Sequence, residues 1–167
     1  NTATGVGAAV LGEECTGTGD HGTSIGHFAT AVGVESVAIG HFAEANAIED
    51  LAIGANSHCH TGTGRGVAIG SNAETTGTEG LCLGRSSAAF GARSCVAGWQ
   101  STANGADGLA VGSACLSAAV VGCTAVGNQA QALALHGTAI GYLPQVMAGA
   151  DEGVAVGSSA LCRAPRG

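Results

Sequence analysis

The sequence predicts an all-β solenoid, built from a short motif that returns about every fourteen residues. A glycine closes this motif at eleven places, and the steps between these glycines are 14 to 16 residues long. A period kept along a whole chain indicates repeats that bury their faces only against their neighbours. Residue types around the glycine alternate with a period of two, which is typical of strands. These anchor glycines are Gly12, Gly26, Gly40, Gly54, Gly70, Gly84, Gly98, Gly112, Gly127, Gly141 and Gly157.

The composition favours a slender fold. The 167 residues include 30 glycines, whereas aromatic residues make up 3% and charged residues 10%. A wide interior would lack bulk to fill it, so we expect one thin repeat domain over residues 1–167 with about eleven coils. The net charge of -7 and the absence of lysine disfavour nucleic acid as a partner. The apolar runs are too short to span a bilayer, so no membrane insertion is expected from this segment.

The three residues before each anchor glycine are predicted to form the first strand of a coil. At 37–39 they read Val-Ala-Ile, and most repeats likewise have a small residue between two aliphatic ones. Successive side chains of a strand point to opposite faces. We expect the aliphatic side chains to fill the interior and the small residue to face outward.

The second strand is predicted to follow the anchor glycine, where small residues recur three places on, as at Ala43 and Ala73. Seven places after several anchors a further glycine recurs, as at Gly33 and Gly77. We expect the chain to reverse there with a positive φ, which glycine adopts at the lowest cost. Each coil is therefore predicted to hold two strands and two turns.

The recurring unit resembles the YadA-like head repeats of trimeric autotransporter adhesins, which run close to N-S-V-A-I-G-x-x-A-x-A-x-G-x. The similarity is greatest at ESVAIGHFAEA (35–45) and GVAIGSNAETTG (66–77), and the period covers nearly the entire chain. The resemblance implies a left-handed parallel β-roll, three chains packed side by side, and a non-enzymatic role in binding host or environmental ligands.

The small middle residues of the first strands form a continuous apolar column. If this column faces outward, it needs a partner surface, which gives a physical reason for the trimer that the resemblance implies. The predicted trimer interface comprises Ala38, Ala52, Ala68, Cys82, Ala110, Ala125, Ala139 and Ala155.

Charged residues replace the Asn of the family pattern five places before the anchors. Residues at one position of successive coils lie about 4.8 Å apart, so opposite charges there can pair. We expect an alternating ladder of Glu49, Arg65, Glu79, Arg93 and Asp107.

The seven cysteines are unusual for a protein exported through an oxidising compartment. No two of them occupy one position in adjacent coils, so we expect free, buried thiols rather than disulfides. Free thiols fit assembly in a reducing cytoplasm, as for a viral fibre, better than export. The cysteines are Cys15, Cys59, Cys82, Cys95, Cys115, Cys123 and Cys162.

The candidate ligand-binding residues are an aromatic group and two long loops. His27 should stack on His41 and Phe28 on Phe42, because each pair shares a position in adjacent coils. The two long loops lie where the step between anchor glycines is 16 residues. The first loop holds Arg65, and the second holds Asp151 and Glu152. His58 and His60 form a possible metal pair, but the sequence supplies no further ligands for it, so we expect neither metal nor cofactor.

Several enzyme and binding classes are disfavoured by the period. Hexapeptide acyltransferases need multiples of six, and calcium-loaded rolls need a G-G-x-G-x-D frame that the aspartates do not share. Threonines do not keep one column, as an ice-binding face would require. No nucleophile and base recur together, so no catalysis is expected.

Two functions remain open from the sequence. The first is the trimeric head of an adhesin or fibre, extracellular on a cell surface or virion, that binds an extracellular protein or glycan ligand. The second is a purely structural filament or spacer, including a phage or viral tail-fibre module. The second would lack an exposed ligand patch.

Overall fold

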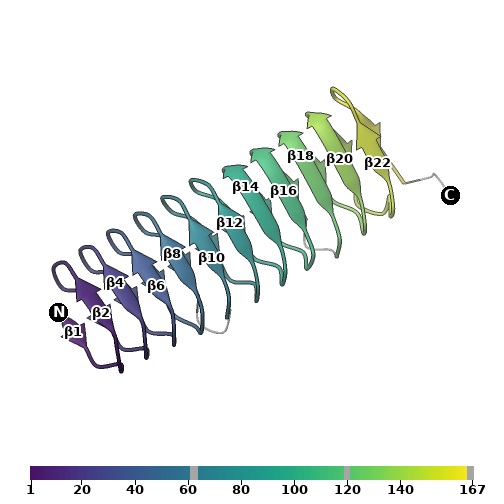
Figure 1. Ribbon diagram of the computed structural model, residues 1–167. Helices are drawn as coiled ribbons and strands as arrows, with labels where there is room; N and C mark the ends of the chain where they lie inside the picture. The colour runs from purple at the N-terminus through teal and green to yellow at the C-terminus, as the bar shows by residue number, and fades with distance from the viewer. Residues whose placement is uncertain (61–63, 119–120, 165–167) are drawn as a thin grey trace.

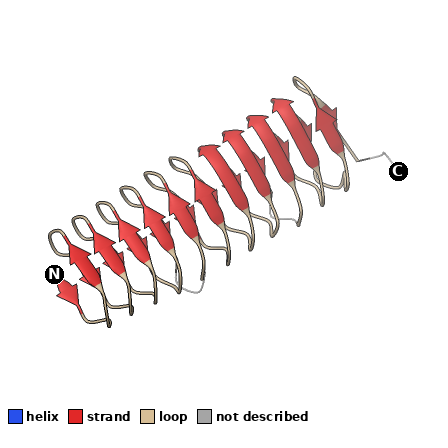
Figure 2. Ribbon diagram, viewed as in Figure 1, coloured by secondary structure: helices blue, strands red, loops and turns tan. Residues whose placement is uncertain are grey.

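The computed structural model describes residues 1–60, 64–118 and 121–164, and in these residues it contains strands and turns but no helix (Figure 2). The strands form a rod-like stack, with β1 at one end and β22 near the other (Figure 1). Consecutive strands alternate between two sheets of 12 and 11 strands. The all-β solenoid of about eleven coils is therefore confirmed.

The 11-stranded sheet takes the strand before each anchor glycine. Its members are β2 (Ala9–Leu11), β4 (Thr23–Ile25), β6 (Val37–Ile39), β8 (Leu51–Ile53), β10 (Val67–Ile69), β12 (Leu81–Leu83), β14 (Cys95–Trp99), β16 (Leu109–Ser113), β18 (Thr124–Asn128), β20 (Thr138–Tyr142) and β22 (Val154–Val156).

The 12-stranded sheet takes the shorter strand after each anchor glycine. Its members are β1 (Thr2–Ala3), β3 (Thr16–Gly17), β5 (Thr30–Ala31), β7 (Glu44–Ala45), β9 (His58–Cys59), β11 (Glu74–Thr75), β13 (Ala88–Ala89), β15 (Thr102–Ala103), β17 (Leu116–Ser117), β19 (Gln131–Ala132), β21 (Gln145–Val146) and β23 (Leu161–Cys162).

All strand pairs within the sheets are parallel. Each strand pairs with the equivalent strand of the preceding coil and of the following coil. Val67 pairs with Leu51 on one side and with Leu81 on the other. Equivalent positions of successive repeats therefore form straight columns along the roll. The insertions that lengthen two coils to 16 residues do not disturb this register, as the pairing of Gln145 with Leu161 shows.

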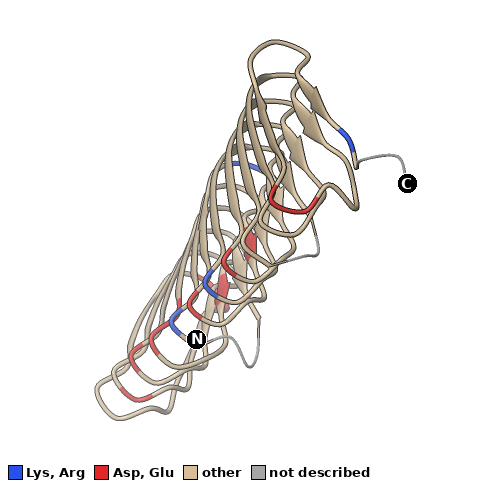
Figure 3. Cartoon of the chain, turned by 90° about the vertical axis from the view of Figure 1, so that its right-hand side faces the viewer, with Lys and Arg blue, Asp and Glu red and all other residues tan. Residues whose placement is uncertain are grey.

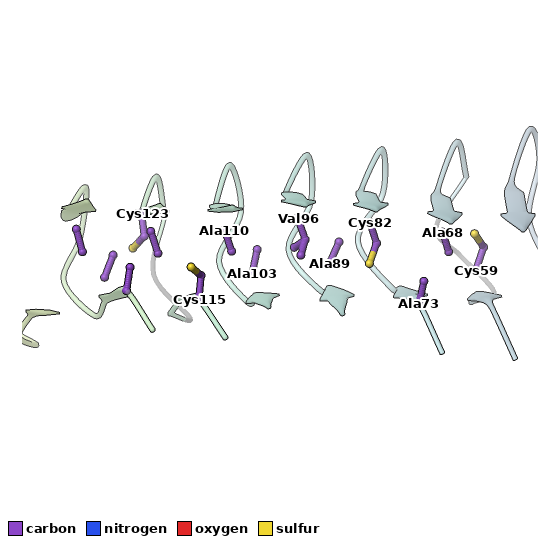
Figure 4. Close-up of a cluster of buried hydrophobic side chains, with 14 of the residues drawn as sticks. Cys59, Ala68, Ala73, Cys82, Ala89, Val96, Ala103, Ala110, Cys115 and Cys123 are labelled. Carbon is purple, nitrogen blue, oxygen red and sulfur yellow. The ribbon is translucent and has the colours of Figure 1, made fainter. Parts of the chain in front are cut away.

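The interior of the roll is filled by small side chains. Ala38, Ala52 and Ala68 are fully buried. Figure 4 shows Ala68 and Cys82 pointing into the interior, where Cys59 and Ala73 face them from the other side of the roll. A coil of 14 residues with two short strands brings its two sheets close together, so the space between them holds Ala, Ser and Cys with an occasional Val or Thr.

This packing reverses two predictions. The aliphatic residues Val37 and Ile39 lie half-buried on the outer face and do not fill the interior. The predicted trimer-interface residues instead lie inside a single chain, where their exposed fractions are between 0% and 3% and no second chain can touch them. These corrected residues are Ala38, Ala52, Ala68, Cys82, Ala110, Ala125, Ala139 and Ala155.

A regular 14-residue coil turns through three positions of positive φ, and the two 16-residue coils add a fourth at Gly64 and Gly149. In one coil these are the anchor Gly40 (φ 136), Phe42 (φ 53) and Glu49 (φ 59). The glycines seven places after the anchors do not share this conformation, contrary to expectation. Gly33 is required because a Cβ there would collide with the backbone carbonyl of Ala47 in the next coil.

A buried aspartate supports the 16-residue coil between Gly54 and Gly70. Asp50 is 1% exposed. Its Oδ2 accepts a hydrogen bond from the backbone N–H of Ala47, and its Oδ1 accepts one from Gly66, both at 2.8 Å. The carboxylate thereby satisfies backbone donors where the chain departs from the regular period.

Candidate functional site

The predicted aromatic group lies on the upper edge of the roll, which we define as the turns that follow the anchor glycines (Figure 1). The rings of Phe28 and Phe42 stack with centroids 4.9 Å apart and planes 4° apart. His27 stacks on His41 at 5.2 Å. The predicted stacking is therefore confirmed, and Phe42 keeps 43% of its surface exposed.

The predicted charge ladder lies on the lower edge, which holds the turns that enter the 11-stranded sheet. Arg65 Nε lies 3.1 Å from Glu49 Oε2, and its Nη1 lies 3.2 Å from Glu79 Oε1. Arg93 donates two hydrogen bonds to the carboxylate of Asp107, of 2.7 and 2.9 Å. Acidic and basic residues follow one another along the roll (Figure 3). The ladder is confirmed as two ion-paired groups, and Arg93 holds the pKa of Asp107 below its ordinary value.

The other loop residues predicted to bind ligand also lie on the lower edge. The Oδ1 of Asp151 accepts a hydrogen bond of 3.2 Å from the backbone N–H of Leu135. Glu152 is exposed beside it, at a positive φ of 59°. A hollow of about 200 Å³ next to Arg65 is lined by Ile48, Gly64 and Thr78 as well. The candidate ligand residues therefore occupy two opposite edges and do not form one site.

The two outer faces of the roll differ in polarity. The 11-stranded sheet presents two aliphatic columns, which contain Val37, Leu51 and Ile53, and Val156 near the end of the roll is 63% exposed. The outward column within the strands of the 12-stranded sheet is mostly polar and includes Thr30, Glu44, His58, Glu74, Thr102, Gln131 and Gln145. The outer face of the 11-stranded sheet is therefore the more continuous apolar surface of the two.

The predicted His58–His60 pair lies on the outer face of the 12-stranded sheet, where it forms a cluster with two glutamates that were not predicted. The rings of His58 and His60 stack with centroids 3.8 Å apart. His58 Nε2 lies 3.1 Å from Glu44 Oε2, and His60 Nε2 lies 2.6 Å from Glu74 Oε1. Burial lowers the pKa of His58, and the neighbouring His60 lowers it further. The register that aligns Glu44, His58 and Glu74 was the signal available in the sequence.

Neither a metal centre nor a membrane-spanning helix is found among the described residues. In residues 1–60, 64–118 and 121–164, no three His, Cys, Asp or Glu side chains are arranged to hold a metal ion. The same ranges contain no helix of the length and hydrophobicity needed to cross a bilayer. The partners that the structure gives His58 and His60 are the carboxylates of Glu44 and Glu74.

All seven cysteines are free, as predicted. Five are buried, while Cys95 and Cys162 are partly exposed. Burial is the main cause that raises the pKa of Cys59 to about 12 and that of Cys82 to about 11. These two thiols therefore stay protonated and unreactive at neutral pH.

The repeat of this chain matches that of a known protein family. The model of the YadA head domain repeat matches residues 18–43, 31–57 and 124–143. No curated protein matches the chain at a significant level. The matched segments lie toward both ends of the roll, and the strand pairing carries the same coil between them. This chain therefore contains a YadA-like head domain.

Proposed function

We propose that this chain is the non-enzymatic head of a trimeric surface adhesin, which binds extracellular protein or glycan ligands through its outer edges. The observation that carries the proposal is the aliphatic outer face of the 11-stranded sheet, on a chain of YadA head repeats. An apolar stripe of this length is unusual on a monomer and favours association with further copies.

Three copies assemble side by side, with their aliphatic faces turned toward a common axis. About eleven coils at ~4.8 Å each give the stripe a length of roughly 50 Å. The polar columns of the 12-stranded sheet then face the solvent. This arrangement replaces the predicted alanine interface with Val, Ile and Leu side chains, which lose more apolar surface on association.

The aromatic group on the upper edge is the first candidate for ligand contact. His27, Phe28, His41 and Phe42 present stacked imidazole and phenyl rings at the surface. The surface of a roll supports weak binding at each site, but three copies raise the avidity by ~10² to 10⁴ without new contacts. Arg65, Asp151 and Glu152 form the second candidate, on the lower edge.

A filament or spacer, including a phage or viral fibre module, is the second candidate function. The observation that favours it is the set of seven free thiols, because reduced cysteines are typical of proteins that fold in a reducing compartment. In addition, the Arg65 guanidinium is already bound to two carboxylates.

Ligand screening separates these functions. The trimer is immobilised and tested against glycans, matrix proteins and whole cells, and compared with Phe28→Asn plus Phe42→Asn. Asparagine stands in the same turn position at Asn56 and Asn72, where it adopts the same positive φ, so the double variant keeps the fold. Loss of binding in this variant, but not in Ser86→Asn, places the ligand on the aromatic group. Binding that is absent for every ligand supports the spacer.

A further inference from the structure

One coil of the aliphatic face has its packing inverted. In β14 the residues read Cys-Val-Ala-Gly-Trp, where neighbouring coils read Leu-Cys-Leu-Gly and Leu-Ala-Val-Gly. Val96 is fully buried inside the roll, between Cys82 and Ala110. The outer positions of this coil are the small Cys95 and Ala97, both half-buried.

The inversion leaves a step in the apolar stripe. Ala97 pairs in register with Leu83 and Val111, and it is the smallest member of its column. Cys95 likewise lies between Leu81 and Leu109. The side chains of the adjacent strands therefore project further outward than those of Cys95 and Ala97. We call the depression over this pair the notch.

The same coil carries the largest side chain of the chain at its upper rim. Trp99 is two residues beyond Ala97 at the end of the same strand and directly follows the anchor Gly98, so it stands at the upper border of the stripe. It is 45% exposed, and the guanidinium carbon of Arg85 lies 5.8 Å from its ring centroid. Its other neighbour in the column is the small Ser113. The indole is thus held at the border of the stripe with much of its surface uncovered.

We infer that Trp99 of one copy packs into the notch of a second copy, and that this contact sets the axial register of the trimer. The inference rests on the proposed side-by-side trimer. Copies related by a threefold axis place the same coil at the same height, so each Trp99 meets the Cys95–Ala97 pair of its neighbour. An indole that fills a depression walled by leucines has the features of an interface hot spot. A shift by one coil would set the indole against the larger Leu and Val side chains of β12 or β16.

The chain contains a single tryptophan, so fluorescence reports on this contact directly. Acrylamide quenching is measured on the assembled chain, whose mass is determined in parallel by light scattering. The control is Trp99→Phe with Tyr142→Trp, which moves the only tryptophan to another exposed site of the same column. There the preceding outward residue is Ile140, so there is no notch. We expect severalfold weaker quenching for Trp99 than for the control.

The variant Ala97→Leu fills the notch with the residue type common in its column. It adds apolar contacts within the roll, so the chain stays folded. We expect the indole to become exposed, with quenching close to that of the control, and the trimer to dissociate at a protein concentration at least about tenfold higher. A trimer in which Trp99 is quenched as strongly as the control, or in which Ala97→Leu leaves it protected, overturns the inference alone. A wild-type chain that is monomeric at all concentrations overturns the trimer as well.

Discussion

Ala38 is fully buried inside the roll, whereas Ile39, the next residue of β6, lies half-buried on its outer face. Strand alternation carries this relationship through most coils, so small residues line the interior and aliphatic residues cover the outside. Substitutions at neighbouring positions should therefore have different consequences. Enlarging an inner residue strains the roll, and changing an outer residue affects association.

The variant Ala68→Leu tests the interior. Ala68 lies between Ala52 and Cys82, and none of these three residues has exposed surface, so the larger side chain has no space. We expect the free energy of unfolding to fall by about 1–3 kcal/mol. Chemical denaturation followed by circular dichroism measures it. The control Ile69→Leu, on the outer face, should cost less than ~1.5 kcal/mol. Equal effects of the two variants would contradict the assignment of inner and outer faces.

The carboxylate of Asp50 is predicted to be essential for the longer coil. Asp50→Ala leaves the buried N–H of Gly66 and the N–H of Ala47 without their acceptor, at about 1–3 kcal/mol for each unsatisfied donor. Asp50→Asn keeps one acceptor oxygen and should lose less. The exposed Asp151 accepts one hydrogen bond from the backbone, and Asp151→Ala should cost under ~1 kcal/mol. Denaturation curves in which Asp50→Ala and Asp151→Ala coincide would refute this role.

The His58 cluster predicts a loss of stability on acidification. Burial lowers the pKa of His58 in the folded state below its ordinary value of 6.5, so the unfolded chain binds this proton more tightly. The contribution of His58 is complete above pH 6.5 and is lost as the pH falls toward the lowered value. His58→Gln should flatten the dependence of unfolding free energy on pH. An NMR titration of His58 at or above its ordinary pKa would contradict the sign.

Thiol accessibility is expected to follow burial. At about pH 8, a thiol reagent should label only Cys95 and Cys162 in the native chain, because the other five thiols are buried and shielded from the reagent. All seven should react after denaturation. In the assembled protein Cys95 should also be protected, since it lies on the aliphatic face, while Cys162 should not. The variants Cys95→Ser and Cys162→Ser assign the signals, and rapid labelling of Cys59 or Cys82 in the native state would count against the packed interior.

The sequence predicts the coil, its period and the columns, because Gly40 and its equivalents recur where the backbone needs a positive φ. The stacking of Phe28 on Phe42 and the pairing of Arg65 with its glutamates follow from the same columns. The period alone does not say which side of a strand is inside. That choice depends on the distance between the sheets, which is too short for Ile39 and suits Ala38.

The glutamate partners of His58 and His60 were missed for a related reason. Glu44 and His58 share a column, but His60 reaches Glu74 diagonally, across a 16-residue step. Such a contact depends on side-chain direction as well as register. Left-handedness of the roll and ligand contact by the edge residues stay predictions from the family resemblance and the columns.

The molar mass of the chain in solution, measured by light scattering for the wild type and two charge variants, tests the central claim most directly. Ile53→Glu places a charge in the middle of the aliphatic face, and Thr30→Glu places the same charge on the polar face of the 12-stranded sheet. Burial of an unpaired charge at an interface opposes association strongly. We predict a trimer for the wild type and for Thr30→Glu, and a folded monomer for Ile53→Glu. A folded wild-type monomer at micromolar concentration, or a trimer that persists in Ile53→Glu, would contradict the account.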